Sequence, residues 1–278
     1  MVSGRRDPCL TPARIVSHPK VTQKKENTMD LTNVIAFRSN KTIYRDGDTV
    51  VKVFGEGFKK ADVLNEALNH ARVEETALNV PKLYGVGMTG DGKWYIMTEY
   101  IPGQTLAELM AQNPKKHAQY LDQFVDLQLL MHRQISPLLP RLRDKMDRKI
   151  IQTELPTATK YDLHTRLESM PRHNKLCHGD FNPTNIIIRD DGTPFILDWS
   201  HATQGNASAD AARTYLLFAL SGDEKTAEAY LKLFCEKSET QRQYVQKWIP
   251  IVAASQSVKG KPEERELLFR WVDVVDYE

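Results

Sequence analysis

The alternation of apolar and polar residues changes about a third of the way along the chain. Before that point it has the short period of β-strands, in NVIAF, KTIYR and TVVKVF within residues 33–54 and in KLYGVGM and KWYIMTEYI within residues 82–101. Val, Ile, Tyr and Phe are frequent in these runs, and the turn signals RDGD and TGDG separate them. Such a series predicts a small antiparallel sheet.

One helix is predicted between these strands, over residues 59–78. It is indicated by residues that fall on one stripe at helical spacing, after which Pro81 closes the segment: Leu64, Leu68, Ala71, Glu75 and Leu78. Glu75 is the unusual member of this stripe, because a carboxylate on an apolar face needs a partner or an exposed edge.

Beyond the Pro-Gly pair at 102–103 the helical period dominates. Thr105 and Glu108 have the spacing of a capping box that opens the first of these helices. The others are predicted over 118–135, 142–151, 160–170, 210–220, 225–236, 240–254 and 262–275. A single hairpin interrupts them, formed by III, the turn RDDG and FIL. The pattern therefore predicts an α+β protein with a β-rich part (29–101), a larger helical part (102–278) and a cleft between them, where small-molecule sites often lie.

Composition narrows the class of protein. The 278 residues are 41% apolar and 27% charged, as in ordinary soluble globular proteins. The net charge of +2 comes from dispersed basic residues, which predicts no nucleic-acid partner. No apolar run approaches the roughly 20 residues of a membrane span, so no membrane association is expected. Three separated cysteines without CxxC spacing argue against disulfides and zinc and favour a cytoplasmic location. No feature of the sequence predicts an oligomeric state.

Residues 1–28 stand apart from the rest. They combine prolines, glycines and basic residues with no helical or strand period, and Met29 follows them directly. We expect a disordered tail or an upstream translation start that contributes nothing to the fold.

The polar residues that surround the predicted hairpin are the strongest indication of chemistry. In LCHGDFNPTNIIIRDDGTPFILDW, Asp180 and Asn185 precede the first apolar strand and Asp198 follows the second. If the two strands pair, Asn185 and Asp198 emerge at the same open end. Hard oxygen ligands of this kind suit a Mg²⁺ ion that already carries phosphates. The spacing therefore predicts a metal site.

HGDFNPTN followed by ILDW resembles the aminoglycoside phosphotransferase and choline kinase family, relatives of the protein kinases. The resemblance runs from about Asn33 to the C-terminal helices. It implies a two-lobed protein-kinase-like fold, with a nucleotide-binding N-lobe and a C-lobe that carries the catalytic loop and the acceptor site. It also implies transfer of the γ-phosphate of ATP or GTP, with Mg²⁺, to a hydroxyl of a small molecule such as an aminoglycoside, choline or a sugar.

Carried over to this chain, the resemblance makes Asp180 the catalytic base and Asn185 and Asp198 the Mg²⁺ ligands. Lys52, in TVVKVF, matches the lysine that holds the donor phosphates. His178 is expected to brace the loop rather than transfer protons.

The resemblance also places the adenine against the backbone of Glu99, Tyr100 and Ile101. Glu66 matches the acidic partner of the phosphate-binding lysine by spacing, although Glu75 remains the alternative because it lies in the apolar stripe.

The chain departs from the family in the turn between its first two strands. The family often has a glycine there, whereas AFRSNKT has none, so Ser39, Asn40 or Lys41 would have to add donors for phosphate. This departure supports an alternative, a nucleotide-binding module of the same fold with weak or no turnover. A protein kinase proper is disfavoured, because HGD stands in place of HRD.

Several residues also have a purely structural interpretation. Asp180, Asn185 and Asp198 fit turns and caps when each is taken alone, and Lys52 fits a surface strand. Asp210 is predicted to cap the following helix and is left outside the site. Cys177 is predicted to be an inert core thiol.

The acceptor is left open by the sequence. A polycationic acceptor would need an acidic wall, for which the C-terminal DVVDYE offers Asp273, Asp276 and Glu278. A choline-like acceptor would need an aromatic cage. The candidates for such a cage are Trp199, Tyr215, Trp248 and Trp271.

Overall fold

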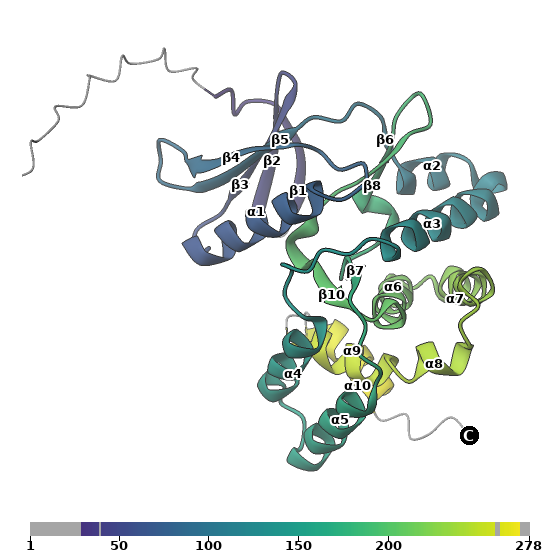
Figure 1. Cartoon of the computed structure of the whole chain (residues 1–278). Helices are drawn as coiled ribbons and strands as arrows, with labels where there is room; N and C mark the ends of the chain where they lie inside the picture. Colours follow the sequence, from purple (N-terminus) through teal and green to yellow (C-terminus); the bar gives the residue numbers. More distant parts are fainter. Residues whose placement is uncertain (1–28, 39, 259–261, 273–278) are drawn as a thin grey trace, which may run out of the picture.

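The structure, a computed structural model, describes residues 29–38, 40–258 and 262–272. It is an α+β protein with an antiparallel sheet and one helix on one side and a larger, mainly helical part on the other (Figure 1). The predicted fold class is confirmed. The predicted tail, Ser39 and the C-terminal DVVDYE lie outside the described residues.

The sheet has five strands in the order β1-β2-β3-β5-β4, all neighbours being antiparallel. The strands are β1 (Val34–Arg38), β2 (Lys41–Asp46), β3 (Thr49–Phe54), β4 (Leu83–Met88) and β5 (Trp94–Glu99). Short turns join β2 to β3 and β4 to β5, as RDGD and TGDG predict. The helix α1 (Lys60–Glu74) packs against this sheet.

The predicted buried face of α1 is wrong. Leu64 and Leu68 are 42% and 47% exposed. The residues that face the interior belong to a neighbouring stripe: Val63, Ala67, His70 and Val73. The buried imidazole of His70 is satisfied, because its Nε2 lies 2.6 Å from the carbonyl oxygen of Pro81. The buried face of α1 thus combines two valines and an alanine with one hydrogen-bonded histidine, while two leucines face solvent.

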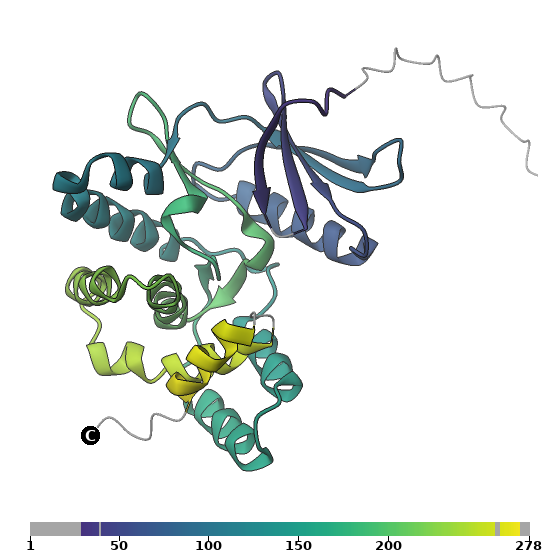
Figure 2. The same cartoon turned by 180° about the vertical axis from the view of Figure 1, so that it is seen from behind.

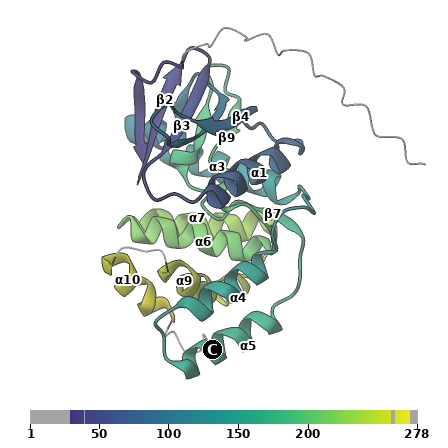
Figure 3. The same cartoon turned by 90° about the vertical axis from the view of Figure 1, so that its left-hand side faces the viewer.

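The helical part begins with α2, which starts at the predicted capping box of Thr105 and Glu108. Its helices are α2 (Leu106–Gln112), α3 (His117–His132), α4 (Leu142–Gln152), α5 (Thr157–Ser169), α6 (Ala207–Leu220), α7 (Glu224–Ser238), α8 (Arg242–Gln246), α9 (Ile249–Ser257) and α10 (Pro262–Val272). In side view, α6 and α7 lie between the sheet with α1 and the group formed by α4, α5, α9 and α10 (Figure 3).

The single helix predicted over 240–254 is two helices, α8 and α9. Pro250 lies in the first turn of α9, where the missing N–H of proline costs nothing but would break a continuous helix. Within the described residues, no helix is both long and apolar enough to cross a membrane.

The predicted hairpin is confirmed. β8 (Ile186–Ile188) and β9 (Pro194–Ile196) are antiparallel with Ile186 opposite Ile196, and β6 (Gln104–Thr105) pairs with β8. β7 (Lys175–Cys177) precedes the hairpin in the chain and β10 (Thr203–Gly205) follows it, and these two strands pair with each other. Seen from behind, the green segment that carries these strands lies between the sheet and the helices (Figure 2). The hairpin is thereby placed where the two parts of the protein meet.

Candidate active site

A cavity of about 260 Å³ lies between the sheet and the helical part. Apolar side chains from both sides line it, among them Val50 and Ile96 from the sheet and Leu197 from the segment after β9. The charged residues around it are Arg38, Lys41, Lys52, Glu66, Glu99 and Asp198. An apolar cavity with a few convergent charged groups is the usual form of a small-molecule site.

Lys52 projects into this cavity because of the period of β3. Val51 and Val53 are buried in the core, so the intervening lysine points to the other face of the sheet. Its Nζ lies 2.8 Å from Oε1 of Glu66 and 3.4 Å from Oδ1 of Asp198. Burial acts to lower the pKa of the Lys52 ammonium, but the two carboxylates outweigh it and raise that pKa. Lys52 is therefore a cation at neutral pH.

Glu66, and not Glu75, is the acid that contacts Lys52. Glu66 lies in the middle of α1, and its second oxygen, Oε2, accepts from Lys41 Nζ at 2.8 Å. Glu75 follows the last residue of α1 and is exposed. One carboxylate thus holds two lysines at the edge of the cavity.

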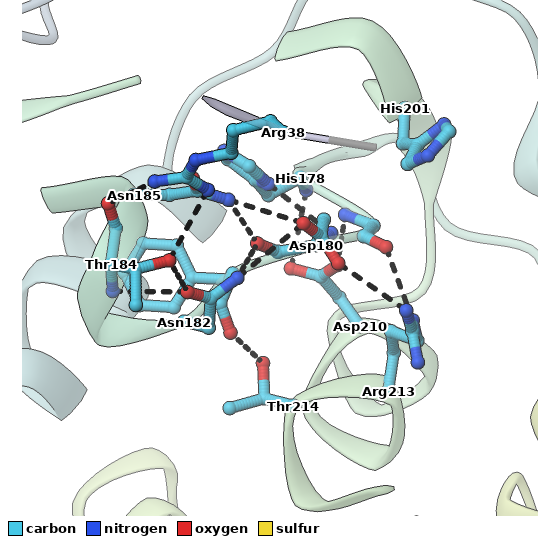
Figure 4. A network of polar contacts seen from close by, with 12 residues as sticks. Arg38, His178, Asp180, Asn182, Thr184, Asn185, His201, Asp210, Arg213 and Thr214 are labelled. Atoms are coloured by element: carbon cyan, nitrogen blue, oxygen red, sulfur yellow. Dashed lines mark hydrogen bonds and ion pairs between the residues drawn. The ribbon is translucent and has the colours of Figure 1, made fainter. Parts of the chain in front are cut away.

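Asp180 lies on the loop between β7 and the turn that precedes β8, and its neighbours orient it closely (Figure 4). Arg213 Nη2 is 3.3 Å from Oδ1 of Asp180. The Nδ2 of Asn185 donates to the carbonyl oxygen of Asp180 at 2.9 Å and to its Oδ2 at 3.2 Å. The side chain of Asp180 nevertheless remains 29% exposed. A carboxylate held in this way keeps an accessible edge from which to accept a proton.

Asn185 and Asp198 are close together, as the hairpin predicts. The backbone N–H of Leu197 donates to the carbonyl oxygen of Asn185 at 2.8 Å, which joins the two strand ends. Because Asn185 Nδ2 is committed to Asp180, its Oδ1 is the atom available to a cation.

Asp198 adopts a left-handed backbone conformation with φ 57°, which is costly for a residue with a Cβ and is found mainly at functional sites. Its Oδ1 is buried, and Lys52 Nζ lies 3.4 Å from it. Burial acts to raise the pKa of Asp198, but Lys52 and Lys41 outweigh it and hold that pKa well below its usual range. The carboxylate is therefore ionised.

The Oδ1 of Asn185 and the carboxylate of Asp198 fit a magnesium ion. Both are hard ligands, and Mg²⁺ is commonly held by one or two protein oxygens together with substrate phosphates. Across the described ranges, no three His, Cys, Asp or Glu side chains gather closely enough to hold a metal by themselves. The donor set suits an ion that arrives with a nucleotide.

His178 connects the loop of Asp180 to the strand end that carries Asp198. Its Nδ1 accepts from the backbone N–H of Asp180 at 3.2 Å, so Nε2 carries the proton and donates to the carbonyl oxygen of Leu197 at 2.9 Å. The ring packs on Trp199 with centroids 4.6 Å apart. With both nitrogens occupied, His178 has the bracing position that the resemblance implied.

The interpretation of Asp210 as a helix cap is wrong. Asn206 caps α6 by accepting from the N–H of Ser208 at 2.9 Å. Asp210 is 3% exposed, and it accepts from the backbone N–H groups of His178 and Gly179 at 3.2 and 2.7 Å.

His132 of α3 completes the set of Asp210 partners, with Nε2 3.0 Å from Oδ2. Burial acts to raise the pKa of Asp210, whereas His132 and the amides lower it, and the net direction is down. Asp210 is thus an ionised group that fastens the Asp180 loop to α6.

Sequence reasoning also missed Arg213 and Arg38. Arg213 lies three residues after Asp210 on α6, so the two side chains share a helix face, and that spacing was the available signal. Arg38, at the end of β1, donates from Nη1 to Oδ1 of Asn185 at 3.0 Å. Nothing local in the sequence connects residues 147 positions apart.

Two of the predicted phosphate donors in the β1–β2 turn, Lys41 and Asn40, lie in different places. Lys41 lines the cavity, as described above. Asn40 does not, because its Nδ2 donates to the carbonyl oxygen of Glu56 at 3.0 Å on another side of the sheet edge.

Three of the four aromatic candidates for an acceptor cage belong to the core. Trp199, Tyr215 and Trp248 are 1%, 7% and 3% exposed, so none of them offers an open face to a cation. Tyr215 and Trp271 pack edge to face with centroids 5.6 Å apart. Cys177 is fully buried, and burial raises the pKa of its thiol well above the usual value, as expected of an inert core cysteine.

Proteins of known structure share the fold of this chain. A thermostable mutant of aminoglycoside phosphotransferase APH(4)-Ia, in a ternary complex with AMP-PNP and hygromycin B, superposes with a TM-score of 0.65 at 16% identity, covering 90% of this chain and 94% of that one. A choline/ethanolamine kinase family protein from Mesorhizobium loti gives 0.57 at 14% identity over 90% of both chains. The GDP complex of wild-type aminoglycoside 2'-phosphotransferase-IIIa gives 0.58 at 16% identity, covering 89% and 93%.

No curated protein matches the chain in sequence. One family model does, that of the phosphotransferase enzyme family, over residues 35–245. This match spans well over half of the chain and includes Lys52, the loop of Asp180 and the hairpin that ends at Asp198. The chain therefore belongs to the phosphotransferase enzyme family.

Proposed function

We propose that the protein binds ATP or GTP with Mg²⁺ in the cavity and transfers the terminal phosphate to a hydroxyl of a small molecule. One observation carries this proposal. The ion-pair chain from Glu66 through Lys52 to Asp198 ends beside the pair of Asn185 and Asp180. Phosphoryl transfer needs a cation for the donor phosphates, oxygen ligands for a metal and a carboxylate for the nucleophile, and these five residues supply all three.

The nucleotide base would lie against residues 99–101. The N–H groups of Glu99 and Tyr100 already donate to the carbonyl oxygens of Lys82 and Asp48, at 2.8 and 2.9 Å. The N–H of Ile101 is therefore the donor that we assign to the base. Lys52, kept charged by its two carboxylates, would bind the donor phosphates.

Asn185 and Asp198 would hold the Mg²⁺. Bound there, the ion would neutralise charge on the phosphates as the terminal group is transferred.

Asp180 would orient the acceptor hydroxyl and accept its proton. Arg213 and Asn185 contact the carboxylate from two sides, so its accessible edge is held in one orientation. Because transfer of a phosphoryl group is largely dissociative, this orientation contributes as much as proton removal.

The comparisons support the substrate classes. One of the similar structures contains AMP-PNP with hygromycin B, and another contains GDP. We extend from these a purine nucleotide as donor and a small hydroxylated molecule as acceptor. The acceptor could be an aminoglycoside, a choline-like alcohol or a sugar.

The test measures ADP release with each member of a panel of aminoglycosides, choline-like alcohols and sugars as acceptor. Calorimetry with Mg²⁺ measures nucleotide binding separately. We expect release that depends on one acceptor class. Asp180→Asn should lower kcat by roughly 10²–10⁴-fold with nucleotide affinity retained. Binding without turnover for any acceptor would favour the inactive nucleotide-binding module instead. An Asp180→Asn variant that works at the wild-type rate would remove Asp180 from its assigned role.

A further inference from the structure

Arg38 reaches across the cavity from the end of β1 to the strand end opposite (Figure 4). Its Nη1 donates to Oδ1 of Asn185 at 3.0 Å and to Oγ1 of Thr184 at 3.3 Å, and its Nη2 donates to the carbonyl oxygen of Thr184 at 3.1 Å. Arg38 thus joins β1 to the loop of Asp180 as a cation that rests on the oxygen assigned to Mg²⁺.

Arg38 and a metal ion compete for the same atom. A Mg²⁺ ion lies 2.0–2.1 Å, roughly, from each of its oxygen ligands. A guanidinium nitrogen 3.0 Å from that oxygen would then lie within a few ångströms of the ion, where like charges repel strongly outside bulk water. The two cations therefore exclude each other at Asn185.

The partners of Arg38 leave it free to take an anion. Lys41 and Lys52 share the carboxylate of Glu66, and Arg213 is paired with Asp180. Arg38, in contrast, contacts only neutral oxygens among the described residues. A planar guanidinium beside a phosphate site, with no carboxylate to neutralise it, favours phosphate oxygens over an amide oxygen.

We propose that Arg38 is a side-chain cation of the site for the donor nucleotide and that it exchanges with Mg²⁺ at Asn185. Without metal, its guanidinium contacts Asn185 and the nucleotide phosphates together and supports binding. When Mg²⁺ accompanies the nucleotide, the ion takes Oδ1 of Asn185 and Arg38 turns wholly to the phosphates. A side-chain charge thereby replaces the glycine-bearing turn that β1 and β2 lack. This inference rests on the proposed function, because it assumes a nucleotide in the cavity.

The exchange makes nucleotide binding unusually tolerant of metal removal, and that tolerance depends on Arg38. The experiment measures the Kd of ATP by calorimetry, with Mg²⁺ and with EDTA, for the wild type, Arg38→Met and Arg148→Met. Methionine keeps the length of the side chain and removes the charge. Arg148 is an exposed arginine of α4, outside the residues that line the cavity, so its variant controls for the loss of one positive charge.

We expect the wild type and Arg148→Met to bind ATP in both conditions. For Arg38→Met, the Kd in EDTA should rise about 10–100-fold, the effect of losing a charge-assisted contact to phosphate, whereas the Kd with Mg²⁺ should rise less than about threefold. Because Arg38 is exposed, the variant should melt at the wild-type temperature, which separates this effect from misfolding.

The other outcomes overturn the exchange. Equal losses in both conditions would make Arg38 an ordinary phosphate ligand, and no loss in either would make its contact with Asn185 incidental. If the wild type binds ATP with Mg²⁺ but not in EDTA, the exchange fails while the proposed function stands. If the wild type binds no nucleotide in either condition, both fail.

Discussion

Replacing Asp210 tests whether α6 fastens the loop that carries Asp180. The buried carboxylate accepts from two backbone N–H groups, at 2.7 and 3.2 Å, and contacts His132 at 3.0 Å. Asp210→Ala would leave all three partners without this acceptor. Each lost partner costs about 1–3 kcal/mol, and breaking a buried charged network costs about 3–5 kcal/mol in total. We expect Asp210→Ala to lower the free energy of unfolding by about 3–5 kcal/mol and Asp210→Asn by less, since an amide keeps one acceptor.

Replacing Asp210 should lower kcat without weakening ATP binding. Asp210 does not line the cavity, so ATP affinity should stay within about threefold of the wild type. The loop that carries Asp180 would lose its anchor, and we expect kcat of Asp210→Asn to fall about 10–100-fold through misplacement of that carboxylate. The assays are urea denaturation, calorimetric titration with ATP and acceptor-dependent ADP release.

The pH dependence of stability tests the role of Asp210 independently. The pKa of Asp210 is lower in the folded protein than its ordinary value near 3.8. Its contribution to stability is therefore complete above that value and is lost as the pH falls through the folded pKa. The wild type should lose more stability than Asp210→Asn between about pH 5 and pH 2, because the amide does not titrate.

The matched control is Asp223, which accepts from the N–H of Thr226 at 3.0 Å as the cap of α7. Asp223→Ala should cost about 1 kcal/mol, as loss of an ordinary helix cap does, and should leave kcat unchanged. If Asp210→Ala costs no more than the Asp223 variant, and kcat is also unaffected, Asp210 is only a helix residue and the anchoring argument is wrong.

Three further predictions concern other groups. Glu66→Gln removes the acid that holds two lysines, so the Kd of ATP should rise about tenfold by calorimetry, whereas the exposed Glu75→Gln should change nothing; equal effects would contradict the pairing. Asp198→Ala should raise, by about tenfold or more, the Mg²⁺ concentration that gives half-maximal ATP binding, and an unchanged requirement would exclude it as a ligand. Peptide mapping after brief treatment with iodoacetamide should find Cys235 modified and Cys177 unmodified until urea is added, because only the latter is fully buried with a strongly raised thiol pKa; rapid labelling of Cys177 in the native protein would refute this.

Sequence alone determined those features that depend on local period and spacing. The turns RDGD and TGDG predicted the connections within the sheet, and the turn RDDG predicted a hairpin whose ends bring Asn185 and Asp198 together. Both follow from the two-residue repeat of a strand and the geometry of a short turn, which need no information from distant residues. The α+β class followed in the same way.

Only the tertiary structure decided which surfaces and side chains meet. The apolar stripe of α1 did not reveal its buried face, because the sheet accommodates Ala67 and a hydrogen-bonded His70 better than the larger leucines, which solvent tolerates. The contact of Asp210 with the Asp180 loop joins residues 31 positions apart, and the contact of Arg38 with Asn185 joins residues 147 positions apart. Contacts at such separations depend on how helices and sheet pack as whole bodies, and no local pattern of apolar and polar residues encodes that packing.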